Sequence, residues 1–173
     1  GQNAGNIGSD GVFNFSSSAF FANNGNITAD NTSSSGVRNE GATFDNSVNA
    51  TINIGQNDGN IGGIGMSNAE GAATFTNNGN INIDNTSSSG LRNKTTFNNA
   101  ANATINIGQN VGSTVGIGIS NSESSAAFTN DGDINIDNTS SSGIDNKSTF
   151  NNAIDATIDI GQSIGNISGN GIS

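Results

Sequence analysis

The fold is decided by the stretch Gly90-Leu-Arg-Asn-Lys-Thr-Thr-Phe-Asn-Asn-Ala-Ala-Asn-Ala-Thr-Ile-Asn-Ile-Gly108. After its first glycine come an aliphatic residue and Asn, then Phe-x-Asn, then Ile-x-Ile. Two slightly different units alternate, so a longer repeat of 53 or 54 residues begins at positions 1, 55, 108 and 161. Repeats of this length indicate a stacked array, and we interpret residues 1–173 as one repeat domain. The basic unit has 26 or 27 residues and starts at Gly36, Gly63, Gly90, Gly116 and Gly143.

Composition limits both the core and the chemistry. Hydrophobic residues make up 31% of the chain and aromatic residues 5%, too few for a rounded core of normal size. The chain has no Cys, His, Pro, Trp or Tyr, which excludes disulfides, Cys or His metal sites and His-dependent catalysis. A net charge of -10 opposes phosphate binding, so we expect no nucleic-acid partner. No apolar run is long enough for a signal peptide or a membrane span.

Within each unit, apolar and polar residues alternate as in strands that bury one face. Ala103-Thr-Ile-Asn-Ile107 and Asn80-Ile-Asn-Ile83 are the clearest examples. Three short strands per unit, separated by Gly, Asn and Ser corners, predict an all-β fold: a parallel β-solenoid (β-helix) of about six and a half coils. We expect a right-handed coil, because parallel crossovers have that hand. Six coils spaced by ~4.8 Å make a rod roughly 30 Å long.

Stacking places equivalent apolar residues of successive coils over one another. The predicted phenylalanine ladder contains Phe21, Phe44, Phe75, Phe97, Phe128 and Phe150. Two isoleucine ladders follow: Ile27, Ile52, Ile81, Ile105, Ile134 and Ile158, and then Ile54, Ile83, Ile107, Ile136 and Ile160, with Ala29 in the first coil. The remaining wall is predicted from Val37, Met66, Leu91, Ile119 and Ile144.

Two series of asparagines recur with the same regularity. A side-chain amide both donates and accepts, so each Asn can bond the amides above and below it, as in cross-β stacks. We therefore predict structural Asn ladders in preference to exposed ligand-binding amides. One series lies two residues after the ladder phenylalanines and the other lies before them: Asn23, Asn46, Asn77, Asn99, Asn130 and Asn152, and Asn14, Asn39, Asn68, Asn93, Asn121 and Asn146.

The acidic residues of the last coils are candidate Ca²⁺ ligands. Asp131, Asp133 and Asp137 are close in sequence, and Asp159 is expected one coil away, which places several oxygen ligands on one outward face. The Gly-Gly-x-Gly-x-Asp nonapeptide of calcium-binding β-rolls is absent, so a solvated acidic face is the competing interpretation. Beyond this possible Ca²⁺ ion we expect no cofactor.

Catalysis and ice binding find less support in the sequence. The acids occupy no constant position: Asp133 corresponds to Asn80 and Asn26, so paired catalytic carboxylates are not indicated and no enzyme is expected. An ice-binding face needs regular Thr pairs, and Thr74-Phe-Thr76 has the right form, but the equivalent pair in every other coil contains at most one Thr. Four basic residues are expected near one corner, as solvated charges or as a docking edge: Arg38, Arg92, Lys94 and Lys147.

The motif Gly90-Leu-Arg-Asn-x-Thr-Thr-Phe-Asn-Asn with Ala103-Thr-Ile-Asn-Ile-Gly108 resembles the repeats of very large secreted surface proteins and adhesins of bacteria, notably Bacteroidota. The resemblance covers the whole chain and implies an adhesin, sheath or fibre, with no functional residues to carry over. Together with the repeat architecture it predicts a non-catalytic structural protein, either a stiff stalk or adhesin segment or a filament subunit. The alternative is a binding module that recognises ice, glycans or Ca²⁺ on one face.

The ends of the array predict the partners and the location. No cap is visible: residues 1–10 match residues 55–64, and residues 161–173 match residues 108–120. Uncapped coils expose strand edges, so we expect end-to-end β-stacking with adjacent repeats or with another copy, and surface glycans as a further possible partner. The start at Gly1 is interpreted as a removed leader or as a piece of a longer polypeptide. We expect an extracellular or cell-surface location.

Overall fold

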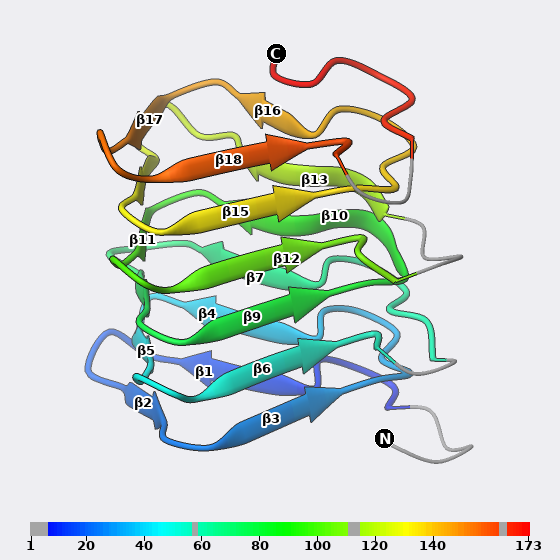
Figure 1. Cartoon of the computed structure of the whole chain (residues 1–173). Coiled ribbons are helices and arrows are strands. Elements are labelled where there is room, and N and C mark those ends of the chain that lie inside the picture. The colour runs from blue at the N-terminus through cyan, green and yellow to red at the C-terminus, as the bar shows by residue number, and fades with distance from the viewer. Residues whose placement is uncertain (1–6, 57–58, 111–114, 163–165) are drawn as a thin grey trace.

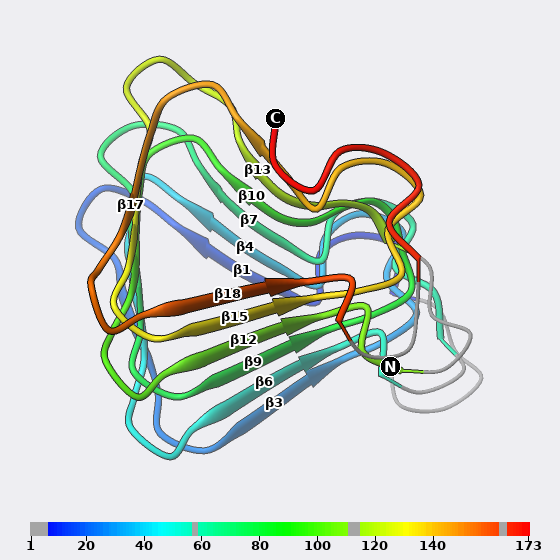
Figure 2. The same cartoon turned by 45° about the horizontal axis from the view of Figure 1, so that its top comes forward.

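The computed structural model describes residues 7–56, 59–110, 115–162 and 166–173, and in these residues it contains strands and no helix. The chain climbs in six coils, and each coil contributes one strand to each of three parallel six-stranded sheets (Figure 1). In Figure 2 the chain turns anticlockwise as it rises toward the viewer from the N-terminal to the C-terminal coil. The expected right-handed parallel β-solenoid is therefore confirmed.

The three sheets form the sides of a triangular rod (Figure 2). The first sheet has the order β1-β4-β7-β10-β13-β16, with bounds Val12–Phe15, Val37–Glu40, Met66–Ala69, Thr86–Asn93, Val115–Asn121 and Ile144–Asn146. The second sheet has the order β2-β5-β8-β11-β14-β17, with bounds Phe20–Asn23, Thr43–Asn46, Thr74–Asn77, Thr96–Asn99, Ala127–Asn130 and Thr149–Asn152. The third has the order β3-β6-β9-β12-β15-β18, with bounds Asn26–Ala29, Thr51–Ile54, Asn80–Ile83, Thr104–Ile107, Asp133–Ile136 and Thr157–Ile160.

The apolar ladders stack in the predicted register. Phe44, Phe75, Phe97 and Phe128 are fully buried, and neighbouring rings along the ladder are stacked with centroids 4.6 to 5.0 Å apart. Both isoleucine ladders and the Val37 to Ile144 wall also pair residue for residue between strands. The interior is thus a continuous apolar column. Phe21 and Phe150, in the terminal coils, are only half-buried because each has a ring on one side.

Both predicted asparagine ladders are confirmed. Each amide nitrogen donates to the amide oxygen of the next coil, at 2.7 to 3.0 Å along the two series. The same nitrogens also donate to carbonyl oxygens at the corners, for example Asn39 Nδ2 to Ala42 O at 2.9 Å. An amide that bonds along the axis and into the corner satisfies buried backbone groups that strands alone leave unpaired.

The start of the coil differs from the prediction. The glycines that stack are Gly11, Gly36, Gly65, Gly90, Gly118 and Gly143, and Gly63 and Gly116 lie outside this column. A Cβ on Gly65 would lie 2.6 Å from Gly90 O and 2.4 Å from an Ile83 methyl group, so the column tolerates no side chain. Coils therefore alternate in length, and 26 to 27 residues is their average. Alignment of the units missed this because the longer coils have two glycines near this position: Gly63 and Gly65 in one, and Gly116 and Gly118 in the other.

Sequence analysis also missed a fourth, very short side of the coil. Single parallel bridges there join Ile7 to Thr32, Ile61 to Thr86, Val115 to Thr139 and Thr139 to Ile167. Along this column a threonine from one kind of unit lies next to an isoleucine or valine from the other kind, because the two kinds of unit follow each other in turn. The Oγ1 atoms of Thr32 and Thr86 are buried without a hydrogen-bond partner.

Candidate functional site

The four candidate Ca²⁺ ligands do not lie together. Asp131 is an exposed corner residue, while Asp133 and Asp159 are exposed on the outer face of the third sheet. Asp133 accepts a hydrogen bond from Thr157 Oγ1 at 2.6 Å. Asp137 is buried at the next corner. In the described part of the chain, no three His, Cys, Asp or Glu residues are grouped to hold a metal ion.

Asp137 belongs to a series that corrects the expectation of acids at no constant position. The repeated Asp-Asn-Thr-Ser-Ser-Ser-Gly motif places Asp30, Asp84 and Asp137 one long repeat apart, and all three carboxylates are buried. Asp84 accepts from the side chains of Gln56 and Asn110, and from the Asn110 backbone at 3.3 Å. Asp30 accepts from the Gln56 backbone at 3.0 Å. Charged acceptors of backbone N–H groups hold turns strongly. Asp30 and Asp84 thus anchor the Gly-Gln-Asn corners that begin at Gly55 and Gly108, a structural role.

The basic residues pair mainly within the rod. Arg38 Nη2 lies 2.6 Å from Glu40 and Nη1 lies 3.8 Å from Asp10, while Lys94 and Lys147 lie 2.9 and 3.3 Å from Glu123 and Asp145. Hydrogen bonding to Lys94 lowers the pKa of Glu123. Arg92 is half-buried, and burial lowers its pKa from the usual value. Three of the four basic residues therefore have an acidic partner within the rod, and Arg38 and Arg92 lie in one column of the first sheet.

The outer faces of the sheets carry incomplete polar columns. On the second sheet, four threonines share a column with Phe20 and Ala127: Thr43, Thr74, Thr96 and Thr149. The adjacent column contains few threonines, so the paired Thr array of an ice-binding face is not formed.

On the third sheet an outer asparagine ladder, which sequence analysis missed, joins Asn53, Asn82, Asn106 and Asn135 at 2.9 Å per step.

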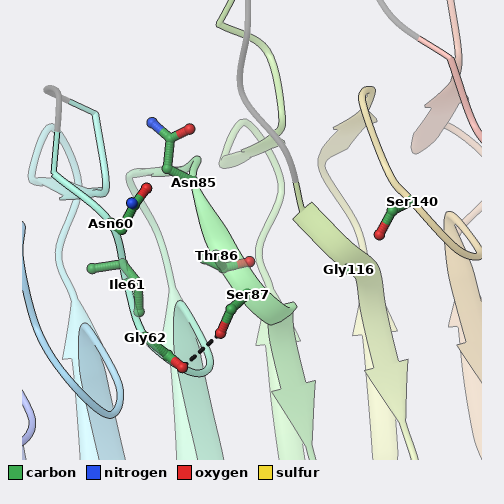
Figure 3. A pocket seen from close by; sticks show the side chains of 8 residues that line it. All are labelled: Asn60, Ile61, Gly62, Asn85, Thr86, Ser87, Gly116 and Ser140. Carbon is green, nitrogen blue, oxygen red and sulfur yellow. Dashed lines mark hydrogen bonds between the residues drawn. The ribbon is translucent and has the colours of Figure 1, made fainter.

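A polar groove of about 540 Å³ crosses several coils along the fourth side (Figure 3). Its polar lining comes from Asn60, Asn85, Ser87 and Ser140, and Ile61, Gly62, Thr86 and Gly116 complete it. Ser87 Oγ donates to Gly62 O at 2.6 Å, the bond drawn in Figure 3. Neutral amides and hydroxyls in a hollow of this size suit a hydroxylated ligand. None of the described residues that line it is aromatic.

A second hollow, of about 390 Å³, lies at the corner between the first and second sheets. It is lined by Phe15, Ser16, Ser17, Glu40, Gly41, Glu70 and Gly71, and we call it the acidic corner. A hydrogen bond with Glu70, together with burial, raises the pKa of Glu40, while Arg38 opposes that rise. Exposed phenylalanines flank the hollow: Phe13 is 52% and Phe15 is 63% exposed, and their ring centroids are 5.5 Å apart. Sequence analysis did not single out these residues.

Comparisons with protein families, with curated proteins and with solved structures found no match to this chain. The likeness to Bacteroidota surface proteins therefore stays a prediction, whereas the solenoid repeat that it implied is confirmed. In the described residues no helix is long and apolar enough to cross a membrane.

Proposed function

We propose that this chain is a non-catalytic structural protein: a stiff segment of an extracellular or cell-surface stalk or adhesin, or a subunit of a filament. The observation that carries the proposal is the continuity of the ladders. Phenylalanine, isoleucine and two asparagine columns each pass through all six coils, so each coil is joined to the next by the same contacts. Such an array behaves as a one-dimensional stack whose stability comes from neighbouring coils.

Its ends are suited to joining further coils. In the described residues the edges of β2 and β3 at one end, and of β17 and β18 at the other, have no strand paired with them. Parallel edges recruit further strands because their N–H and C=O groups lack partners. We propose end-to-end β-stacking with adjacent repeats or with another copy as the way in which the rod is extended.

Localisation and electron microscopy of native material test this function together. Antibodies against the purified chain, with immunogold labelling of intact cells that make it, should label the outer surface or extracellular threads. Negative-stain images of the extracted material should show unbranched rods as wide as one coil. Labelling confined to the cytoplasm, or compact particles in place of rods, would contradict the proposal.

The polar groove supports a second candidate, a module that binds neutral glycans. Among the described residues, the groove offers amide and hydroxyl side chains from three coils and no charged one, which fits the hydroxyl groups of a sugar chain. A glycan array with the whole chain is the test, with Ser140→Ala and Asn85→Ala as groove variants and Asn151→Ala as an outer-face control. Binding that both groove variants weaken and the control does not would favour this function; no retained glycan would remove it.

A further inference from the structure

The acidic corner lies where the repeat pattern is broken on the outside of the rod. Phe13 occupies a column whose other members are polar or charged: Arg38, Ser67, Arg92, Ser120 and Asp145. Phe15 is in register with Glu40 and Ala69. Two phenyl rings that are more than half exposed gain little from burial in this rod. Because the other coils have no phenylalanine at these outer positions, the ladders of the rod do not explain Phe13 and Phe15.

The corner already holds one cation, supplied by the chain itself. The guanidinium carbon of Arg38 lies 5.1 Å from the centroid of the Phe13 ring, within the range of a cation–π interaction. The same guanidinium bonds Glu40 at 2.6 Å and faces Asp10 at 3.8 Å. An aromatic face beside carboxylates is therefore an arrangement that accommodates a guanidinium group here.

The same combination recurs beside it without a cation. Phe15 and Glu70 line the hollow with Glu40, and none of the four basic residues, all of them in the described chain, is within ion-pair distance of Glu70. Arg38 contacts two carboxylates, Asp10 and Glu40. Glu70 adds a third, which is hydrogen-bonded to Glu40 and has no basic residue of the described chain within ion-pair distance. Local charge complementarity thus calls for a second positive group, and the net charge of -10 attracts cationic partners to the rod.

We propose that the acidic corner docks an exposed arginine or lysine side chain of a partner polypeptide, which stacks on Phe15 and bonds Glu40 and Glu70. A metal ion fits less well, because Ca²⁺ takes six to eight oxygen ligands and phenyl rings supply none. An anionic partner such as nucleic acid is disfavoured by the same carboxylates. Docking gives the rod a side attachment point near its N-terminal end, which is independent of how its ends are joined.

The test is a titration of the ¹⁵N-labelled whole chain, followed by amide chemical shifts at low salt. The probes are the capped pentapeptide Gly-Gly-Arg-Gly-Gly and its Gly-Gly-Gln-Gly-Gly counterpart. We expect the arginine peptide alone to shift the amides of Phe15, Glu40, Gly41 and Glu70. Phe15→Ser should weaken this binding about 3-fold, the factor expected for loss of one exposed cation–π contact. Glu70→Gln should weaken it by a similar factor, which added salt reduces.

Two matched variants separate docking from general effects. Val48→Ser removes a 70% exposed apolar side chain at a distant corner, and Glu123→Gln removes an acid that is paired with Lys94. Both should bind the arginine peptide as the unmodified chain does. Equal binding of the glutamine peptide, equal weakening in the control variants, or no shift at millimolar peptide would overturn the proposal. Tetramethylammonium chloride or calcium chloride that binds these residues as tightly as the peptide would overturn the polypeptide assignment.

Discussion

Asn77→Asp tests the asparagine ladder with a change of almost no volume. Asn77 is fully buried, and its Nδ2 donates to Asn99 Oδ1 at 2.8 Å and to Thr104 O at 3.4 Å. Its Oδ1 accepts from Asn46 Nδ2 at 2.8 Å and from Gly79 N at 3.3 Å. A carboxylate keeps the two accepted bonds but has no hydrogen to donate. It also places a charge against the Asn99 oxygen.

The expected loss of stability depends on pH, and its sign follows from the buried carboxyl. Burial and the loss of a donor raise the pKa of the introduced carboxyl above its unfolded value of about 3.9, by ~3 or more. Each unit corresponds to about 1.4 kcal/mol, so at about pH 8 the variant should lose ~4 kcal/mol or more of unfolding free energy. Below about pH 4 the protonated carboxyl donates to Asn99, and the loss should fall to about 1 kcal/mol.

Urea unfolding followed by circular dichroism at several pH values measures this difference. Asn80→Asp is the matched control, because residue 80 is exposed and the same column already contains Asp133. Both variants carry the same added charge, so the difference between them isolates the buried position. An Asn77→Asp chain as stable as Asn80→Asp under mildly alkaline conditions, or a difference that does not vary with pH, would refute the ladder as a source of stability.

Three further changes test other parts of the rod. Phe97→Ala should lower the free energy of unfolding by about 3–5 kcal/mol in a urea melt, because it leaves a cavity between two stacked rings; a loss below about 1 kcal/mol would contradict the phenylalanine ladder. Thr86→Val should be neutral or stabilising by ~1 kcal/mol, since the buried hydroxyl has no partner and Val115 fills the next place in that column; clear destabilisation would reveal a bond that the structure lacks. The pKa of Glu40, followed by carboxyl ¹³C shifts, should lie above its ordinary value, and Glu70→Gln should lower it because the amide donates to the carboxylate. The contribution of Glu40 to the stability of the unmodified chain should therefore fall as the pH rises from the unfolded toward the folded pKa of Glu40.

The interior of this rod was predictable because residues that meet along the axis are equivalent residues of successive units. Aligning the units therefore identified the contacts of Phe97, Asn99 and Ile105 without any knowledge of three-dimensional geometry. The same method failed at Gly63 and Gly116, where the longer coils offer two glycines and only packing against the coil above selects one. Alignment of units is thus reliable for strands and less so for corners, whose lengths alternate.

By itself, the sequence determined the parallel solenoid, the composition of its ladders and the absence of Cys and His chemistry, because these follow from residue types that recur at a constant spacing. Only the tertiary structure decided which side chains from different columns meet around a corner. Glu40 and Glu70 lie in successive coils but in different places of their units, and Arg38 reaches Phe13, Glu40 and Asp10 from one position. Such contacts depend on the turn of the backbone and the direction of each side chain, which periodicity does not encode.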